Sequence, residues 1–332
     1  MSKKALIGGL LFLLTGVVFS QQYDFRPLTI KEGVPSSYVY ALCEDQRGNM
    51  WIGTESGGIG IYDGYEFESL TVVDGLGVNR VFAITEDSKG NIWIGTDGDG
   101  VKRYNGHQLI DMTDSLGIHS KGIWAIFEDQ QGNIWISTSS GGITIWDGTH
   151  SQHIGKQHGL SDNRTSAICE DSSGTIWVGT HDFGLNKIQD GKVTTVGMPT
   201  SANFRSITDL MLRSNGELLI ATRYGLYKIQ DGEYVPAVHD VLKYKHISAI
   251  KETSDGSIWV AIYGEGVYRI INDSYFFYNM NNGLSNVYIY AIQEDRNGQV
   301  WFGTEGESIF RFFGAPFPLF TTKEGLGDNI EA

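Results

Sequence analysis

The sequence predicts an all-β fold, a seven-bladed β-propeller with four antiparallel strands in each blade. One phrase, which runs from Glu44-Asp45 through Gly48 to Trp51-Ile52-Gly53-Thr54, recurs along almost the whole chain. Its anchor positions lie 42, 42, 42, 42, 40 and 42 residues apart, and a fixed period of this size with strand-like content is typical of propeller blades. The anchors are Trp51, Trp93, Trp135, Trp177, Leu219, Trp259 and Trp301.

The composition suits a fold with many tight turns. The 332 residues include 43 glycines and 6 prolines, and glycine adopts the positive φ angles that tight turns require. Aromatic residues make up 12% of the chain and supply large apolar faces for packing. The formal net charge of −14 argues against a nucleic-acid ligand.

The N-terminal twenty residues resemble a secretory signal. Lys3 and Lys4 precede an apolar run, Ala5 to Phe19, and Val18-Phe19-Ser20 offers small residues at the usual cleavage positions. We therefore expect a signal peptide over residues 1–20 and a periplasmic or secreted mature chain. An uncleaved anchor helix is the alternative, although the run is short for a membrane span.

Within one repeat the pattern predicts four strands. They cover Val39 to Glu44, Met50 to Thr54, Ile59 to Tyr62 and Tyr65 to Thr71, and Asp63-Gly64 between the last two is a hairpin signal. We expect the glycine at Gly48 and its six equivalents to have positive φ, and the aspartate before it to bond the amides of its own turn. The tryptophans are expected to pack one blade against the next.

Two terminal segments compete for the outer strand of blade seven. The segment that starts at Phe25-Arg26-Pro27-Leu28 and the one that starts at Phe317-Pro318-Leu319-Phe320 both look like outer strands. We expect the N-terminal copy to close the ring, because pairing there removes an exposed sheet edge. The propeller then spans residues 21–316, and 317–332 forms an exit strand or linker towards a further domain.

Cys43 and Cys169 occupy the same repeat position in blades one and four. The ring should hold them further apart than the roughly 7 Å between Cα atoms that a disulfide tolerates. We expect two small core residues and no disulfide.

The repeated phrase, followed by Gly-Gly-Ile, Tyr-Asp-Gly, Leu-Thr and Asp-Gly-Leu, resembles the two-component regulator propeller repeat over nearly all of residues 25–326. The resemblance implies the extracytoplasmic sensor region of bacterial histidine kinases, including the Bacteroidetes hybrid kinases that detect glycans. Such proteins usually carry a second propeller, an immunoglobulin-like domain, a membrane helix and a cytoplasmic transmitter. The partners it implies are an oligosaccharide or other small extracellular ligand and downstream kinase domains, with a homodimer as a further option.

Charge divides between the two faces of the predicted ring. The turns after the inner strands hold acidic residues, which we interpret as turn chemistry and solubility: Glu44, Asp45, Glu86, Asp87, Glu128, Asp129, Glu170, Asp171, Glu252, Asp255, Glu294 and Asp295. The loops that enter the inner strands, with the hairpins beside them, carry basic residues: Arg80, Lys121, Arg164, Arg205, Lys245, His246, His181 and Arg223. A basic ring around a concave mouth favours anionic ligands, and arginine can grip a carboxylate or sulfate with two bonds. Ordinary solvated loop charge is the alternative.

Aromatic residues mark the same face. At the second position of the inner strands, blades seven, one, two and three carry aromatic side chains and blades four to six carry small hydroxyls: Tyr290, Tyr40, Phe82, Trp124, Ser166, Thr208 and Ser248. Aromatic faces near polar groups suit sugar rings, and buried core aromatics are the alternative. Tyr224 and Tyr263, in the hairpins of blades five and six, complete the candidate ligand-binding set.

Blade five departs most from the repeat. Asp209 replaces the usual alanine, Leu212 the glutamate, Arg213 the aspartate and Leu219 the tryptophan, and its hairpin is one residue shorter. An acid on an inner strand needs a partner. The pattern leaves open whether these changes serve function or drift.

The sequence gives little support to catalysis. It contains no recognisable Ser-His-Asp arrangement, metal-spaced cluster or phosphate loop, and Asp97-Gly98-Asp99-Gly100 lacks the further ligands of a calcium loop. We expect no metal and no cofactor. The repeats also look like those of streptogramin lyases, for which His181 is the available hairpin histidine. A glycan sensor is therefore the leading hypothesis, with a propeller lyase or hydrolase and a protein-interaction scaffold as alternatives.

Overall fold

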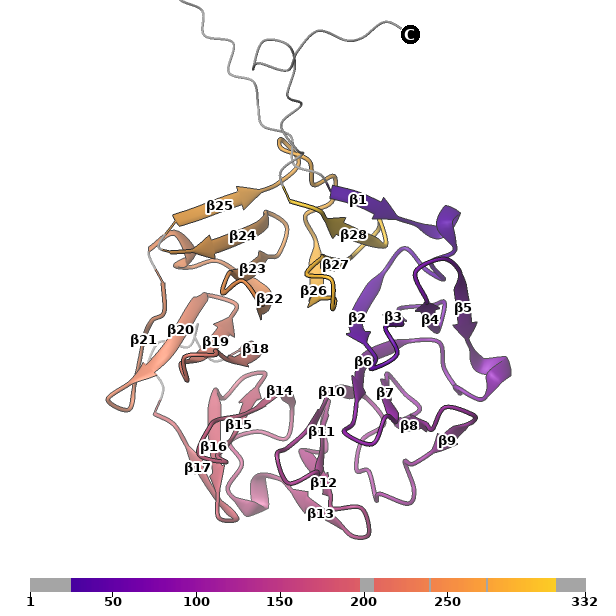
Figure 1. Ribbon diagram of the computed structural model, residues 1–332. Helices are drawn as coiled ribbons and strands as arrows, with labels where there is room; N and C mark the ends of the chain where they lie inside the picture. The colour runs from indigo at the N-terminus through magenta and orange to yellow at the C-terminus, as the bar shows by residue number, and fades with distance from the viewer. Residues whose placement is uncertain (1–24, 198–205, 239, 273, 315–332) are drawn as a thin grey trace, which may run out of the picture.

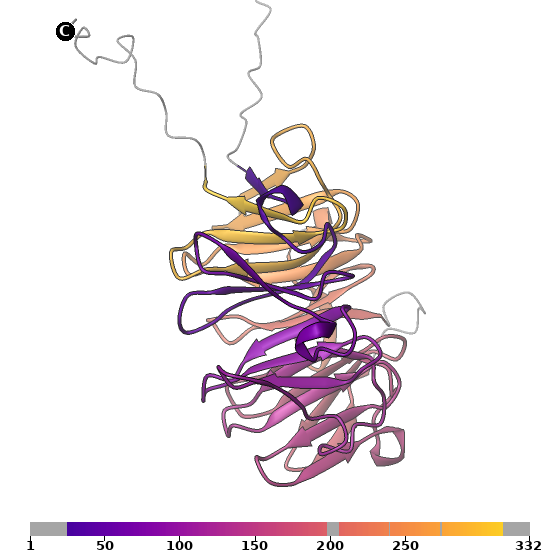
Figure 2. The same cartoon turned by 90° about the vertical axis from the view of Figure 1, so that its right-hand side faces the viewer.

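The protein is a closed ring of seven four-stranded antiparallel sheets (Figure 1). It is described by a computed structural model that covers residues 25–197, 206–238, 240–272 and 274–314. Figure 2 shows the same ring from its edge as a disc. The predicted fold class is confirmed.

Each blade runs from an inner strand at the centre of the ring to an outer strand at the rim (Figure 1). Blades one to three are β2 (Val39–Glu44), β3 (Met50–Thr54), β4 (Ile59–Tyr62), β5 (Phe67–Leu70); β6 (Val81–Glu86), β7 (Ile92–Thr96), β8 (Val101–Tyr104), β9 (Leu109–Asp111); and β10 (Ile123–Glu128), β11 (Ile134–Thr138), β12 (Ile143–Trp146), β13 (Ser151–Ile154). Blades four and five are β14 (Thr165–Glu170), β15 (Ile176–Thr180), β16 (Leu185–Gln189), β17 (Lys192–Thr195); and β18 (Ile207–Leu212), β19 (Leu218–Thr222), β20 (Gly225–Gln230), β21 (Glu233–Pro236). Blade six is β22 (Ile247–Glu252), β23 (Ile258–Ile262), β24 (Gly266–Ile271) and β25 (Ser274–Tyr278), and blade seven is β26 (Ile289–Glu294), β27 (Val300–Thr304), β28 (Ile309–Phe312) and β1 (Phe25–Leu28).

The N-terminal strand closes the ring, as predicted. β1 pairs antiparallel with β28, in a register from Phe25 opposite Phe312 to Leu28 opposite Ile309. The ring of Phe25 lies 5.0 Å from that of Phe312 and 5.4 Å from that of Tyr278, measured between centroids. The competing C-terminal segment from Phe317 lies outside the described residues.

The tryptophan column packs between blades. The ring of Trp51 in blade one lies 5.5 Å from that of Tyr104 in blade two, measured between centroids. The ring of Trp93 in blade two lies 5.3 Å from that of Trp146 in blade three. The indole nitrogen of Trp51 also donates to Asp45 over 2.9 Å. The same indole-to-aspartate bond recurs in blades two, three, four and seven.

The aspartates organise the turns that follow the inner strands. Asp45 Oδ1 accepts the backbone amides of Arg47 and Asn49 at 2.9 and 2.8 Å. The glycine of this turn, Gly48, has φ of 94°, and its six equivalents have φ between 76° and 85°, as the sequence predicts. The aspartates thus hold the turns together, and the interpretation of these acids as turn residues is confirmed for the aspartates.

The glutamates before these aspartates bond across blades, a role that the sequence analysis missed. Glu128 of blade three accepts the backbone amide of Ser88 in blade two at 2.6 Å. Five further glutamates make the same bond to the preceding blade: Glu44, Glu86, Glu170, Glu252 and Glu294. At Glu44 the donor is Arg296, so this bond also closes the ring between blades seven and one. Among the described residues the bond is absent only between blades four and five, where Leu212 replaces the glutamate.

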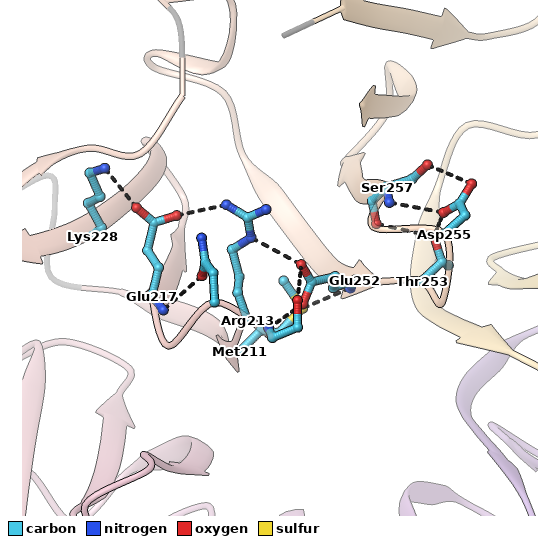
Figure 3. Close-up of polar contacts among 10 residues, drawn as sticks. Met211, Arg213, Glu217, Lys228, Glu252, Thr253, Asp255 and Ser257 are labelled. Atoms are coloured by element: carbon cyan, nitrogen blue, oxygen red, sulfur yellow. Dashed lines mark hydrogen bonds and ion pairs between the residues drawn. The ribbon is translucent and has the colours of Figure 1, made fainter. Parts of the chain in front are cut away.

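Blade five replaces the lost aspartate and tryptophan with a chain of ion pairs (Figure 3). Arg213 contacts Glu217 at 3.0 Å and Glu252 of blade six at 3.3 Å. Lys228 contacts the other oxygen of Glu217 at 2.7 Å. In blade six, Asp255 replaces the missing turn aspartate by accepting bonds from Thr253 and Ser257 at 2.7 and 2.9 Å. The substitutions in blade five therefore come with their own partners.

Cys43 and Cys169 are free thiols. Cys169 is buried and Cys43 is half-buried, and burial raises the pKa of each thiol to about 11. Both stay protonated at neutral pH, which fits their predicted role as small core residues.

We expect Glu128→Ala to lower the free energy of unfolding by about 1 kcal/mol, because the amide and hydroxyl of Ser88 both lose their acceptor. Urea unfolding followed by tryptophan fluorescence measures this change. Glu66→Ala is the control, because Glu66 is exposed and has no cross-blade bond. Equal stability of the two variants would contradict a stabilising role for the glutamate column.

Candidate functional site

One face of the ring gathers the candidate ligand-binding residues. We call it the entry face; it consists of the residues just before the inner strands and the hairpins after the second strands. In all seven blades the first hairpin residue donates its backbone amide to the carbonyl of the entry residue, for example from Asp97 to Arg80 at 3.0 Å. The remaining six bonds are 2.8–3.3 Å long and join Glu55 to Tyr38, Ser139 to Gly122, His181 to Arg164, Arg223 to Ser206, Tyr263 to His246 and Glu305 to Tyr288. The predicted shared face is therefore present.

The inner-strand aromatics of blades seven, one and two form a continuous arc. The ring of Tyr40 lies 5.1 Å from that of Tyr290 and 4.8 Å from that of Phe82, with both pairs edge to face. Tyr263 continues the arc, 5.8 Å from Tyr290. We call Tyr263, Tyr290, Tyr40 and Phe82 the aromatic arc. All four are half-buried, so they are neither closed core residues nor free surface residues.

A carboxylate lies beside the arc. Glu305 Oε2 accepts the hydroxyls of Tyr290 and Tyr263 at 2.9 and 3.2 Å. Burial, with the hydroxyl of Tyr263 and the carboxylate of Glu305, raises the pKa of Tyr290, so its phenol remains a donor at neutral pH. Glu305 pairs with no lysine or arginine within 4 Å in the described part of the chain. Glu305 is not among the candidate ligand-binding residues that the sequence analysis names.

Trp124 lies outside the arc. Its ring is 5.8 Å from that of His181 in the next blade. His181 Nδ1 is 3.2 Å from Asp182, and its Nε2 accepts Nη2 of Arg223 at 3.2 Å. Burial, followed by the charges of Arg223 and Arg164, lowers the pKa of His181. The imidazole is therefore neutral at pH 7 and serves as an acceptor.

Three cations of the basic ring are neutralised locally. Arg80 pairs with Asp97 at 3.0 Å and with Glu55 at 3.5 Å. Lys245 pairs with Glu265 at 2.6 Å. Arg164 pairs with Asp182 and lies 3.6 Å from Asp162. At these three positions, acids on the same face lie within contact distance and offset the basic charge.

The other predicted site residues differ in their surroundings. Lys121 is exposed on its entry loop. Tyr224 is half-buried in the hairpin of blade five, where its carbonyl accepts the hydroxyl of Tyr227 at 3.1 Å. Arg205 lies outside the described residues. The structure thus brings Arg164, His181, Arg223 and Trp124 together, while Arg80 and Lys121 lie elsewhere on the entry face.

The inner strands of blades four and five carry hydroxyls that bond to the following blade. Ser166 donates to the carbonyl of Ile207, and Thr208 donates to that of Ile247, both over 2.7 Å. Their hydroxyls are therefore committed to the scaffold. These small side chains occupy less space than the aromatics at the same position in the other blades, so the two halves of the ring differ in bulk.

Asp209, the acid on the inner strand of blade five, also bonds to the scaffold. Its oxygens accept the backbone amides of Leu210 at 2.8 Å and of Ile250 in blade six at 3.0 Å. Burial outweighs these bonds and raises the pKa of the carboxyl to about 6. Asp209 thus links blades five and six by hydrogen bonds. The sequence left open whether the change from alanine serves function or drift, and in the structure the aspartate has this scaffold role.

Two cavities lie on the opposite face. A cavity of about 560 Å³ opens between blades three and four, and one of about 460 Å³ opens between blades six and seven. Their walls include the turn residues Asp129 and Ser173 in the first and Ser254 and Asn297 in the second. None of the predicted ligand-binding residues lines either cavity.

The described ranges hold no group of three or more histidine, cysteine, aspartate or glutamate side chains arranged to bind a metal ion. Across the same ranges, no helix has the length and apolar character that a membrane crossing requires.

Comparison with known families matches five segments, residues 33–56, 75–98, 117–140, 159–182 and 283–306, to the two-component regulator propeller. These segments are two-component regulator propeller repeats. Each runs from an entry loop through the inner and second strands to the hairpin of blades one, two, three, four and seven. The two unmatched blades, five and six, are those in which the turn aspartate is replaced by Arg213 and Thr253. No curated protein matches the sequence.

Solved structures share this propeller fold. The extracellular domain of a protein proposed to be a hybrid two-component system from B. thetaiotaomicron superposes with a TM-score of 0.76 at 22% identity, covering 89% of this chain and 42% of that one. The extracellular domain of a protein proposed to be a one-component system from B. thetaiotaomicron gives a TM-score of 0.72 at 20% identity, with coverages of 88% and 40%. This chain thus spans about two fifths of the length of these neighbours. A catalytically inactive variant of virginiamycin B lyase from Staphylococcus aureus with quinupristin gives a TM-score of 0.69 at 16% identity, with coverages of 87% and 99%.

We expect stability to depend on the protonation of Asp209. Its pKa of about 6 in the folded state exceeds the ordinary value of 3.8, so the folded protein binds more protons between these values. Stability contributed by the neutral carboxyl is therefore fully present below pH 4 and is lost as the pH rises through 6. Urea unfolding at pH 4 to 7 should give a flatter dependence for Asp209→Asn than for the parent protein. An identical slope would contradict this assignment.

Proposed function

We propose that this protein is an extracytoplasmic glycan-sensing module of a two-component signalling system and that its ligand binds at the entry face. The observation that carries the proposal is the aromatic arc beside Glu305. Flat aromatic rings pack against the apolar faces of sugar rings, and carboxylate oxygens accept hydrogen bonds from sugar hydroxyls. A few placed polar groups beside apolar surface are typical of small-ligand sites.

Two further findings support the proposal. The chain carries two-component regulator propeller repeats, and neighbours of the same fold are extracellular domains of proteins proposed to be two-component systems. The apolar run in residues 5–19 fits export through a signal peptide. Because those neighbours are more than twice as long, we propose that ligand binding biases the packing of the propeller against a following domain. A ligand shifts such an equilibrium only by its difference in affinity for the two arrangements.

We expect Tyr40→Ala to weaken binding of the recognised glycan at least tenfold, because Tyr40 lies in the middle of the arc. Isothermal titration calorimetry against a panel of neutral and acidic oligosaccharides measures the affinity. Tyr65→Ala is the control, because Tyr65 is 91% exposed in the β4–β5 turn, away from the entry face. Thermal unfolding checks that both variants are folded. Absence of binding to every glycan in the panel would contradict the proposed function.

The contacts of His181 favour a lyase as a second candidate. A neutral imidazole with one nitrogen near Asp182 is the arrangement of a general base. However, its other nitrogen already accepts Arg223, so a substrate proton would have to displace that bond. Since this histidine is engaged on both sides, the sensor remains the preferred function.

We expect no turnover of quinupristin or of acidic glycans by this protein, because both nitrogens of His181 are engaged. Product formation is measured by mass spectrometry for the parent protein and for His181→Ala. Turnover by the parent that disappears in the variant would replace the sensor proposal with the lyase.

A further inference from the structure

Arg223 differs from the other described arginines of the entry face. Its side chain is exposed, and no carboxylate of the described residues lies within 4 Å of its guanidinium. Arg80 and Arg164 are both paired with acids. The neighbour of Arg223 is the neutral imidazole of His181, which accepts one of its hydrogen bonds at 3.2 Å and leaves its charge uncompensated. A guanidinium has five N–H donors, so most remain available to an anion.

The backbone holds Arg223 in place. Its amide donates to the carbonyl of Ser206 at 3.3 Å, and the amide of His181 donates to the carbonyl of Arg164 at 2.9 Å. The hairpin that carries Arg223 joins Thr222 to Gly225 with two residues between them. Such a short connection restricts the position of the arginine more than a longer loop would. The hairpin thus fixes where the side chain of Arg223 starts, and the bond to His181 at 3.2 Å orients its guanidinium.

The surroundings of Arg223 suit part of a sugar. His181 connects it to Trp124, whose ring lies 5.8 Å from the imidazole. The inner strands next to it carry Ser166 and Thr208 at their second position. In blades seven, one and two of the aromatic arc the same position holds a bulky ring. On the entry face, an uncompensated cation and an aromatic ring therefore lie on the side of blades three to five. The arc and Glu305 lie on the side of blades six to two.

We infer that Arg223 binds the acidic group, a carboxylate or sulfate, of an anionic oligosaccharide whose neutral sugar rings contact the aromatic arc. This inference rests on the proposed glycan function and names the chemical class of the ligand. A planar guanidinium can bind either anion through two parallel hydrogen bonds. The unpaired carboxylate of Glu305 repels an anionic group from the arc side, so the ligand has one favoured orientation across the face. Arg223 is thus a specificity-determining residue.

The inference is tested with three matched oligosaccharides: a tetramer of three neutral sugars that ends in one uronic acid, its carboxyl-reduced form, and the reduced form with a sulfate on that terminal sugar. We expect Arg223→Ala to weaken binding of the anionic tetramers at least tenfold and to leave binding of the reduced tetramer unchanged. Arg223→Lys keeps the charge and loses the paired geometry, so it should give an intermediate affinity. Lys89→Ala is the control, because Lys89 is an exposed cation in the turn after the inner strand of blade two.

The outcomes separate this inference from the function on which it rests. Anionic binding that weakens with Arg223→Ala supports it, and the uronic and sulfated arms tell which anion is preferred. If Arg223→Ala loses the same affinity for the anionic and the reduced tetramers, the inference is overturned. Arg223 would then maintain the shape of the site and would not contact the acidic group. Binding of the reduced tetramer alone overturns it while glycan recognition stands. Binding of none of the three overturns it, and the wider glycan panel then decides whether glycan recognition itself survives.

Discussion

Closure of the ring is the constraint on which the rest of the structure depends. No blade is a stable unit alone, because a four-stranded sheet must bury its faces against neighbours on both sides. The interactions at the join between the first and last blades include the pairing of β1 with β28 and the bonds from Arg296 to Glu44. Because each inner strand is held by both of its neighbours, the hairpins and entry loops project from a rigid frame.

The two faces of the ring differ: the turn face carries repeated side-chain bonds of the scaffold, and the entry face is the one for which we propose recognition. On the turn face, the aspartate, glycine and glutamate positions repeat because each makes a bond that the ring needs, such as that from Glu128 to Ser88. On the entry face, the repeated bonds use the backbone and the buried threonine that ends the second strand, as in the bond from Thr54 Oγ1 to the carbonyl of Gly58 at 2.8 Å. The other side chains there can vary without loss of the frame. This explains how Tyr40, Trp124 and Arg223 occupy equivalent regions of different blades.

The sequence predicted the fold, the strands of the repeat, the closing strand and the shared entry face, because each leaves a periodic or terminal signal. It failed where interactions join different repeats. The acceptor of the Ser88 amide lies 40 residues away, in the next blade, and no local pattern reveals that geometry. Arg80 was placed in the basic ring, but its ion pairs with Asp97 and Glu55 from two hairpins required coordinates. The alanine position taken by Asp209 was recognised as unusual, but its partner, the amide of Ile250, required coordinates.

Local pairing, more than net charge, determines what the entry face attracts. The chain carries a net charge of −14, yet its acidic turn residues lie at the opposite ends of strands five to six residues long. Such strands span roughly 17–20 Å, about twice the screening length of about 8 Å at physiological ionic strength. The turn face therefore exerts little field on a ligand at the entry face. Arg80 and Arg164 contribute little as well, since their partners cancel them nearby. The charge left on the entry face is therefore divided between its two sides. Arg223 is uncompensated on one side, and Glu305 lies with its tyrosines on the other.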